Sequence, residues 1–139
     1  MKHLLITAVC CLLLMSGCNS SSSDQTASQT TCEAGKDSMK YAMNLYRKVL
    51  PEHLEAYKAS FEKCKVETLK EPGCLAYGMY QSYTDSTEFL IFEVWANKGA
   101  HNEHGKTAHL KQHIQEIKGM GDSSFKPNNV MVYICPNVN

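Results

Sequence analysis

Hydrophobic and polar positions alternate along some parts of this chain and recur every three or four residues along others. Alternating or continuous apolar and aromatic side chains predict four strands, because successive side chains of a strand point to opposite faces of a sheet. These segments are residues 38–48, 74–82, 88–96 and 129–135. The turn-forming residues 84–87 separate the second strand from the third.

Two helices are expected between these strands. The first begins near Pro51, because proline is favoured in the first turn of a helix, and it ends before Gly73. Its apolar positions lie three or four residues apart and form one stripe, made of Leu54, Tyr57, Phe61, Cys64 and Thr68. The second helix follows Asn97, a residue suited to capping, is interrupted at Gly105 and resumes up to residue 118.

The resulting order is βαββαβ, which predicts an α+β domain of the ferredoxin-like type with both helices on one face of a small sheet. Residues 89–95 are apolar at almost every position, so both faces of this strand favour burial. Because the helices cover one face only, we expect the sheet of a second copy to cover the other and to form a homodimer. The alternative is a monomer whose sheet exposes a modest apolar patch.

The N-terminal segment has a different pattern. Its apolar run, residues 4–15, is too short for a stable bilayer-spanning helix, which needs about 20 residues, and suits a signal peptide. The run leads into Ser16-Gly17-Cys18, which resembles the lipobox of bacterial lipoproteins and implies lipid attachment at Cys18. We therefore expect a signal peptide at residues 1–17, a lipidated cysteine with a Ser/Thr-rich tether at 18–35, and a folded domain at 36–139. The alternative is a plain secretory signal.

These features predict a bacterial envelope protein that contacts the membrane through its lipid anchor only. The residue after Cys18 is Asn19, whereas an aspartate there would resemble an inner-membrane retention signal. The outer membrane, with the domain facing the periplasm, is therefore the expected location.

The chain has seven cysteines, and the expected processing changes how they are read. Two belong to the signal peptide and one carries the lipid, so four remain in an oxidising compartment, and an even number favours two disulfides. Since the fourth strand should neighbour the first, the expected pairs are Cys32–Cys135 and Cys64–Cys74. The alternative for the second pair is two free thiols.

Charge excludes one class of function. The whole chain has 14 basic and 14 acidic side chains, and removal of Lys2 with the signal leaves 13 against 14. A protein that binds nucleic acid by bulk electrostatics needs a basic surface, so no nucleic-acid partner is expected.

Two motifs in order carry a resemblance to a known family. Glu71-Pro72-Gly73-Cys74 precedes a strand with several tyrosines, and Phe92-Glu93-Val94-Trp95 is followed by His104 and His109. This set, over about residues 38–136, resembles the antibiotic-biosynthesis monooxygenase family. The resemblance implies a dimeric α+β barrel, which agrees with the apolar third strand.

Many members of that family look like cofactor-free monooxygenases that oxidise phenols or quinols with O2. The resemblance thus implies a small aromatic substrate, O2 as co-substrate, no cofactor, and a mostly dry apolar pocket with a base. We expect His104 as the base, Trp95 in the pocket wall and Asn44 orienting a carbonyl or an O2-derived oxygen. The expected substrate contacts are Tyr46, Tyr77 and His109. Purely structural roles for His104, at the helix break, and for Trp95, in the core, are the alternatives.

Three further functions stay open. Haem degradation is a minor option, because a related branch has Asn, Trp and His in similar places. Metal binding is another, because four histidines lie close together with Glu103: His101, His104, His109 and His113. His109 and His113 would share one helix face, but the family pattern explains His104 and His109 without a metal, so no metal ligands are expected. A non-catalytic binder of small hydrophobic ligands is the third alternative.

Overall fold

The computed structural model describes Gly35 and residues 38–136. It contains a four-stranded sheet, one long helix, two shorter helices and a 3-10 turn. In chain order these are β1 (Lys40–Lys48), η2 (Pro51–His53), α1 (Leu54–Thr68), β2 (Cys74–Gln81), β3 (Glu88–Trp95), α2 (Lys98–His104), α3 (Ala108–Glu116) and β4 (Val130–Ile134). The predicted βαββαβ order is confirmed, and the second helix is divided at Gly105 as expected.

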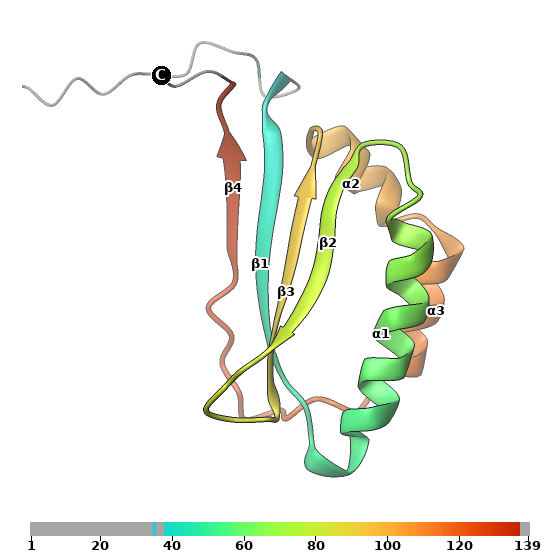
Figure 1. Cartoon of the computed structure of the whole chain (residues 1–139), viewed down its shortest axis with the longest axis vertical. Helices are drawn as coiled ribbons and strands as arrows, with labels where there is room; N and C mark the ends of the chain where they lie inside the picture. The colour runs from blue at the N-terminus through green and yellow to red at the C-terminus, as the bar shows by residue number, and fades with distance from the viewer. Residues whose placement is uncertain (1–34, 36–37, 137–139) are drawn as a thin grey trace, which may run out of the picture. The chain divides into compact units, whose positions relative to one another are not determined.

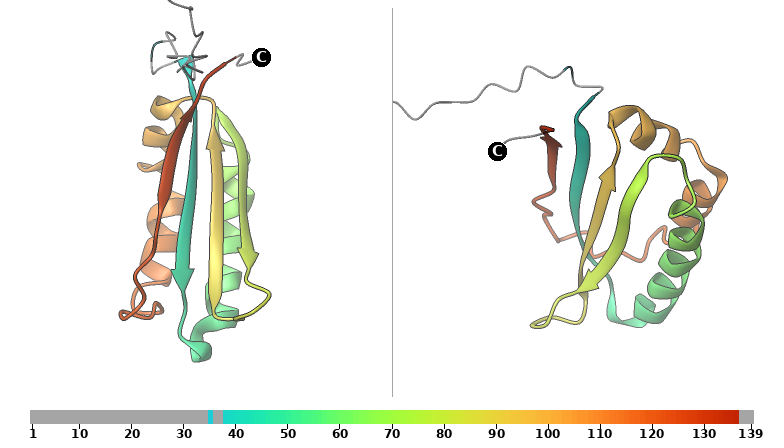
Figure 2. Two further views of the ribbon diagram at one scale, coloured as in Figure 1. Left: turned by 90° about the vertical axis from the view of Figure 1, so that its left-hand side faces the viewer. Right: turned by 45° about the horizontal axis from the view of Figure 1, so that its top comes forward.

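The sheet has the strand order β2-β3-β1-β4, with every neighbouring pair antiparallel. All three helices pack on one face of it, and the other face is left uncovered by the described residues (Figures 1 and 2). The expected pairing of the fourth strand with the first is confirmed, since Ala42 lies opposite Val132. The fold is therefore the α+β ferredoxin-like arrangement.

The core lies between the sheet and α1. Side chains of β3 alternate strictly, and those pointing toward the helices are buried: Phe89, Ile91, Glu93 and Trp95. The predicted stripe of α1 meets them, because Tyr57, Phe61, Cys64 and Thr68 are all buried. The Phe61 ring stacks on Tyr77 of β2 with 5.3 Å between the ring centroids.

The uncovered face of the sheet is apolar. We define the outer face by the side chains that point away from the helices on β1, β3 and β4. Leu90, Phe92 and Val94 of β3 are half-buried there, whereas β4 leaves Val130, Val132 and Ile134 between 41% and 44% exposed. Apolar area of this extent on one face is typical of a surface that a partner covers.

The cysteines require one correction. Cys64 and Cys74 are free, so the predicted Cys64–Cys74 disulfide is wrong. Cys64 lies a full turn before the end of α1, about 6 Å along the helix axis, and its Sγ is 3.7 Å from Thr68 Oγ1. Cys135 is disulfide-bonded, while Cys32, its expected partner, lies outside the described residues.

The predicted signal peptide, the lipidation site at Cys18 and nearly all of the predicted tether also lie outside the described residues. No helix within residues 38–136 has the length and apolar character that crossing a bilayer requires.

Candidate active site

One carboxylate holds two histidines where the helices meet the sheet. Glu71 Oε1 lies 2.6 Å from His104 Nδ1 and 2.7 Å from His109 Nε2. The side chains of Glu71 and His104 are 11% and 3% exposed. Because an ionised carboxylate can only accept hydrogen bonds, Nδ1 of His104 carries the hydrogen. A neutral His104 ring therefore has its lone pair on Nε2, the nitrogen that can accept a proton.

A tight turn between α1 and β2 positions Glu71. Gly73 has φ of +84°, a left-handed conformation that glycine adopts without strain. A Cβ at Gly73 would lie 2.7 Å from Ala100 Cβ, so α2 packs directly against the turn. The carbonyl of Gly73 accepts a 2.7 Å hydrogen bond from the backbone N–H of Ala96, which ties the turn to the end of β3. Glycine here is thus required both by the turn and by the helix.

The break between α2 and α3 positions the two histidines. The Asn97 side chain caps α2 by accepting from the N–H of Ala100 at 2.8 Å, as expected. His104 is the last residue of α2, and the Thr107 hydroxyl donates to its carbonyl at 2.8 Å before α3 begins. His109 follows at the start of α3. A continuous helix would hold these rings in a fixed i, i+5 relation, whereas the break lets both reach one carboxylate.

His104 lies in the wall of a cavity of about 220 Å³ between the sheet and the helices. Most of the surface area of the wall is apolar, and the polar groups in it converge from β1, β2, β3, α1, α2 and α3. The apolar lining is Met43, Leu45, Ile91, Leu110, Ile114 and Ile117, and the polar lining includes Arg47, Tyr57, Tyr77, Glu93, His101, His104 and His113. A concave apolar space with a few converging polar groups is the usual form of a small-molecule site.

Glu93 is a buried acid in this wall. Its Oε2 accepts a 3.0 Å hydrogen bond from Trp95 Nε1, and the Trp95 ring lies 4.8 Å from the His104 ring. Burial raises the pKa of the Glu93 carboxyl, and the Trp95 hydrogen bond only partly opposes this. Glu93 therefore holds a proton more readily than an exposed glutamate, close to His104. Burial likewise raises the pKa of Tyr77, far above that of an exposed tyrosine.

The structure brings together part of the predicted site. Tyr77 and His104 line the same cavity, with their rings 5.5 Å apart. Trp95 is fully buried behind the wall, in contact with His104, and does not line the space itself. His109 meets Glu71 but lies outside this cavity, in the wall of a neighbouring groove.

Asn44 and Tyr46 were predicted wrongly as members of this cavity. Alternation along β1 sends Met43, Leu45 and Arg47 toward the helices, so the even-numbered Asn44 and Tyr46 lie on the outer face. Asn44 accordingly lies with Phe92 and Val130 in a shallow pocket of that face. A shift of one residue along a strand moves a side chain to the opposite face of the sheet.

The histidines do not group as the metal alternative supposed. His113 Nδ1 lies 2.8 Å from Ser60 Oγ, and the His101 ring packs 5.1 Å from the Tyr41 ring. Among the described residues, the group with the geometry to hold a metal ion is Glu71, His104 and His109, whose ligand atoms all lie within 4.8 Å of one another. Its third ligand is thus Glu71, which lies about thirty residues earlier in the chain.

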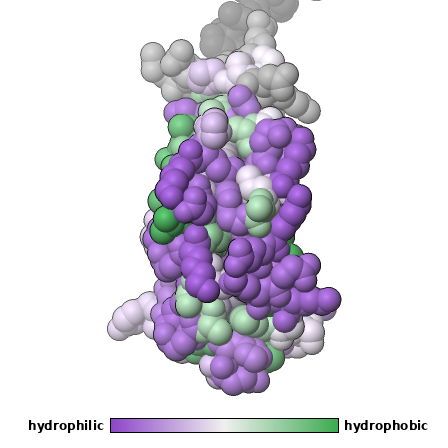
Figure 3. Space-filling view, turned by 90° about the vertical axis from the view of Figure 1, so that its right-hand side faces the viewer, coloured by the Kyte–Doolittle hydropathy of each residue, from purple (hydrophilic) through white to green (hydrophobic). Residues whose placement is uncertain are grey.

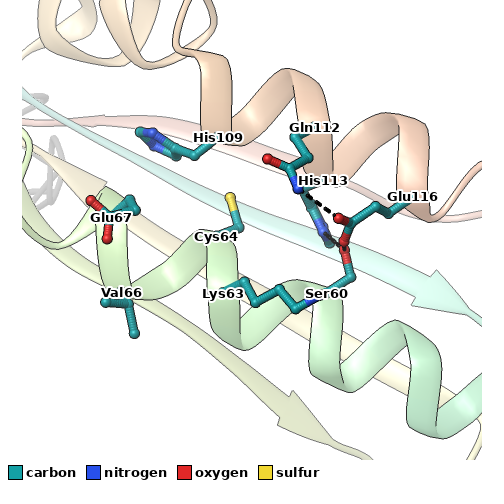
Figure 4. A pocket seen from close by; sticks show the side chains of 9 residues that line it. All are labelled: Ser60, Lys63, Cys64, Val66, Glu67, His109, Gln112, His113 and Glu116. Atoms are coloured by element: carbon teal, nitrogen blue, oxygen red, sulfur yellow. Dashed lines mark hydrogen bonds between the residues drawn. The ribbon is translucent and has the colours of Figure 1, made fainter.

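A larger groove of about 480 Å³ runs between α1 and α3 (Figure 4). In it, Ser60 of α1 donates to Glu116 Oε2 at 2.6 Å and faces the ring of His113, both on α3. This hydrogen-bonded set joins the two helices. Because the Ser60 hydrogen already points to a carboxylate, the set lacks the serine-to-histidine donation that a nucleophilic serine needs. The surface on this helical side is largely hydrophilic (Figure 3).

Sequence reasoning missed Glu71, which binds both histidines, and also Glu93 and Tyr57 in the cavity wall. For each of these residues, a feature of the sequence could have indicated its place. Glu71 stands in the quoted Glu-Pro-Gly-Cys motif, Glu93 shares the parity of the buried Phe89 and Ile91, and Tyr57 belongs to the apolar stripe of α1.

Comparisons with known proteins agree with the geometry. Residues 39–116, more than half of the chain, match the family model described as antibiotic biosynthesis monooxygenase. An uncharacterized protein of Synechocystis is 30% identical over 86 residues, which cover 62% of this chain and 56% of that protein. The uncharacterized protein YjcS of Bacillus subtilis is 26% identical over 94 residues, covering 65% of this chain and 90% of YjcS. The chain thus spans little more than half the length of its Synechocystis relative.

Solved structures share the fold. A conserved protein from Bacteroides thetaiotaomicron has a TM-score of 0.62 at 25% identity, covering 70% of this chain and 99% of that one. A Nitrosomonas europaea protein assigned to the antibiotic biosynthesis monooxygenases has a TM-score of 0.63 at 21% identity, covering 68% and 88%. At such identities the likeness concerns the fold.

Proposed function

Because the chain belongs to the antibiotic biosynthesis monooxygenase family, we propose that it oxidises a small phenol or quinol with O2 in the cavity between the sheet and the helices. The observation that carries this proposal is the contact between Glu71 and His104 in the cavity wall. It supplies an oriented base beside a mostly apolar space, and the deprotonation of a buried hydroxyl requires both.

In the proposed reaction, His104 Nε2 accepts the proton of the substrate hydroxyl. Glu71 fixes the ring orientation and stabilises the imidazolium that forms, as a carboxylate does for other oriented histidine bases. The resulting phenolate gives up electrons more readily than the phenol. Glu93 holds the indole of Trp95 against His104, which keeps the base in place.

All electrons come from the substrate, so we propose O2 as the co-substrate and no cofactor. When a 1,4-hydroquinone becomes a hydroxyquinone, one oxygen atom of O2 enters the ring and the other leaves as water. The ring loses one C–H hydrogen and both hydroxyl hydrogens; two of the three end in water and one on the new hydroxyl. Four electrons pass to O2, and no external reductant is needed.

The test is O2 uptake with a panel of hydroquinones, measured above the rate of autoxidation. The His104→Gln variant should lower the enzymatic rate about 100-fold, because a positioned base contributes that order of acceleration. His53→Gln, at the start of α1 and outside the cavity, is the matched control. With ¹⁸O2, the product should carry one labelled oxygen. Binding of hydroquinones without O2 uptake would leave a non-catalytic binder of small aromatics and overturn the oxygenase.

Metal binding is a second candidate, favoured by the cluster of Glu71, His104 and His109. Two imidazoles and a carboxylate suit Zn²⁺ or Cu²⁺, and such an ion would displace the hydrogens that join the three side chains. Metal analysis of protein purified without a histidine tag decides between the candidates. Stoichiometric metal in the wild type that is lost in His109→Ala would replace the cofactor-free proposal.

We also propose a homodimer that is lipid-anchored through Cys18 at the outer membrane. The apolar outer face supports the dimer, and the Ser16-Gly17-Cys18 sequence supports the anchor. Replacing Cys18 by Ala should move the protein from the detergent-soluble membrane fraction to the soluble periplasmic fraction. Retention of the Cys18→Ala protein in the membrane would contradict the anchor.

A further inference from the structure

The hydroxyl of Tyr57 is buried without a partner. Tyr57 is 3% exposed, and its oxygen makes no hydrogen bond. Among the residues that the structure describes, it is the one buried side-chain oxygen or nitrogen in this condition. A buried hydroxyl left unsatisfied costs about 1–3 kcal/mol, so its presence requires an explanation that packing does not give.

The side chain that carries this hydroxyl lines the cavity of His104, at the other end. Tyr57 lines the cavity from α1, and its ring packs 5.4 Å from Phe89 at the start of β3. The ring of His104 instead packs against Trp95, at the end of the same strand. Between them, Ile91 and Glu93 form the floor. Tyr57 and His104 therefore face one space from opposite ends.

The two ends have opposite hydrogen-bonding character. His104 presents an acceptor, since Glu71 already binds its Nδ1–H. At the far end, the Tyr57 side chain in the wall carries an O–H that has no partner, and the positively charged Arg47 lines the cavity on β1 opposite Phe89. A ligand that satisfies both ends carries a hydroxyl on one side and an oxygen acceptor on the opposite side, with an apolar body between them.

We propose that the Tyr57 hydroxyl donates to the far oxygen of the substrate, so that the site selects rings with oxygens on opposite sides over simple phenols. This inference rests on the proposed function for the role of His104 and adds the substrate class. The volume of about 220 Å³ and the apolar lining suit one ring or two fused rings.

The test uses two ligands that differ by one hydroxyl, 1,4-dihydroxynaphthalene and 1-naphthol. Their binding is measured by calorimetry under anaerobic conditions, so that no oxidation occurs. The wild-type protein should bind the diol about tenfold more tightly than the mono-ol, as one buried hydrogen bond implies. Tyr57→Phe should abolish most of this preference while changing the affinity for 1-naphthol less than about threefold.

Tyr41→Phe is the matched control. Tyr41 is equally buried, at 4% exposure, but its hydroxyl accepts from Lys98 outside the cavity, so this variant should keep the wild-type preference. Tyr57→Phe should also unfold at the same or a higher temperature than the wild type without ligand, because it removes an unsatisfied group. A purely structural Tyr57 would lower the affinity for both ligands alike, and that result overturns the inference.

The outcomes separate this inference from the proposed function. A preference for the diol that depends on Tyr57, without O2 uptake, supports the binding role and rejects the oxygenase. O2 uptake with equal affinity for the two ligands supports the oxygenase and rejects the role of Tyr57. Failure of the wild-type protein to bind either ligand overturns the inference as well.

Discussion

One oxygen atom of Glu71 accepts hydrogen bonds from both His104 and His109. The carboxylate selects the tautomer of His104 and therefore decides which nitrogen can act as a base. Glu71→Gln can place an N–H donor against one of the rings, which favours the wrong tautomer. We expect it to lower the kcat of O2 uptake about 100-fold, with KM changed far less.

The control for Glu71→Gln is Glu67→Gln, four residues earlier in the last turn of α1. Glu67 is exposed and paired with Lys70 at 2.7 Å, so its replacement should leave kcat unchanged. Equal kcat values in Glu71→Gln and the wild type would show that His104 needs no carboxylate.

His113 provides a prediction about pH. Burial lowers the pKa of His113 below its ordinary 6.5, with Glu116 and Ser60 acting in the opposite direction. The folded protein thus binds fewer protons than the unfolded chain near this pH. The stability contribution of neutral His113 is present above about pH 6.5 and is lost as pH falls through the folded-state pKa.

The His113→Asn variant keeps an amide N–H for Ser60 and removes the titration. We expect its free energy of unfolding to fall less than that of the wild type between about pH 7 and pH 5, where one proton changes the slope by up to about 1.4 kcal/mol per pH unit. Urea unfolding at several pH values measures it. Half-buried His101 and buried Glu93 are common to both proteins and cancel in the comparison, so parallel slopes would contradict the assignment to His113.

At the residue scale, the sequence places some side chains of the site correctly and others wrongly. His104 and Tyr77 could be found because the family motif and the strand pattern agree on them. Asn44 and Tyr46 could not be placed correctly from the resemblance, because one step along β1 exchanges the cavity for the outer face. The position of Glu93 could be inferred only from the alternation along β3, which places it on the same face as Ile91.

At the scale of elements, the turn between α1 and β2 depends on Gly73 for both its backbone conformation and its contact with α2. Gly73 and Gly119 both have φ of +84°, but a Cβ at Gly73 would meet Ala100 at 2.7 Å, whereas one at Gly119 would meet nothing within 4 Å. The positive φ costs an alanine about 1–2 kcal/mol at either site. Gly73→Ala must also push α2 away, so we expect it to destabilise by about 3 kcal/mol or more.

Comparing the two alanine variants separates the backbone cost from the contact with α2. Chemical unfolding gives the two free energies, and O2 uptake adds a second readout. Gly73→Ala should lower activity because Glu71 lies two residues earlier, while Gly119→Ala should leave it unchanged. Equal destabilisation by the two substitutions would mean that α2 does not need this glycine.

Elements were predicted well where a local cause determines them. Asn97 caps α2 through its own side chain, and Gly105 ends that helix, so both boundaries could be inferred from single residues. The Cys64–Cys74 bridge could not, because it depended on where the end of α1 lies relative to β2. Thr68, the last residue of the helix, lies four positions after Cys64, and that one turn keeps the thiol beside Thr68.

At the scale of the whole molecule, the sequence raises the question of what covers the outer face of the sheet. In β3, Glu93 lies among the inner residues and Glu88 stands at the start of the strand, so the outer positions Leu90, Phe92 and Val94 are all apolar. The exposed side chains of β4 extend this surface. The sequence could predict that such a face exists, but its partner depends on a second chain.

Val132→Lys tests whether a second copy covers the outer face. Val132 is 44% exposed on β4, and in a face-to-face dimer the substitution would bury two lysines without partners, which costs several kcal/mol. Light scattering after size exclusion should therefore give a monomer mass at concentrations where the wild type is a dimer. Val66→Lys is the matched control, because Val66 is 53% exposed on α1, away from the sheet, and should stay dimeric. The cavity lies on the opposite side of the sheet and is lined by residues of one chain, so the Val132→Lys monomer should still bind 1,4-dihydroxynaphthalene. A Val132→Lys protein that remains dimeric would place the interface elsewhere.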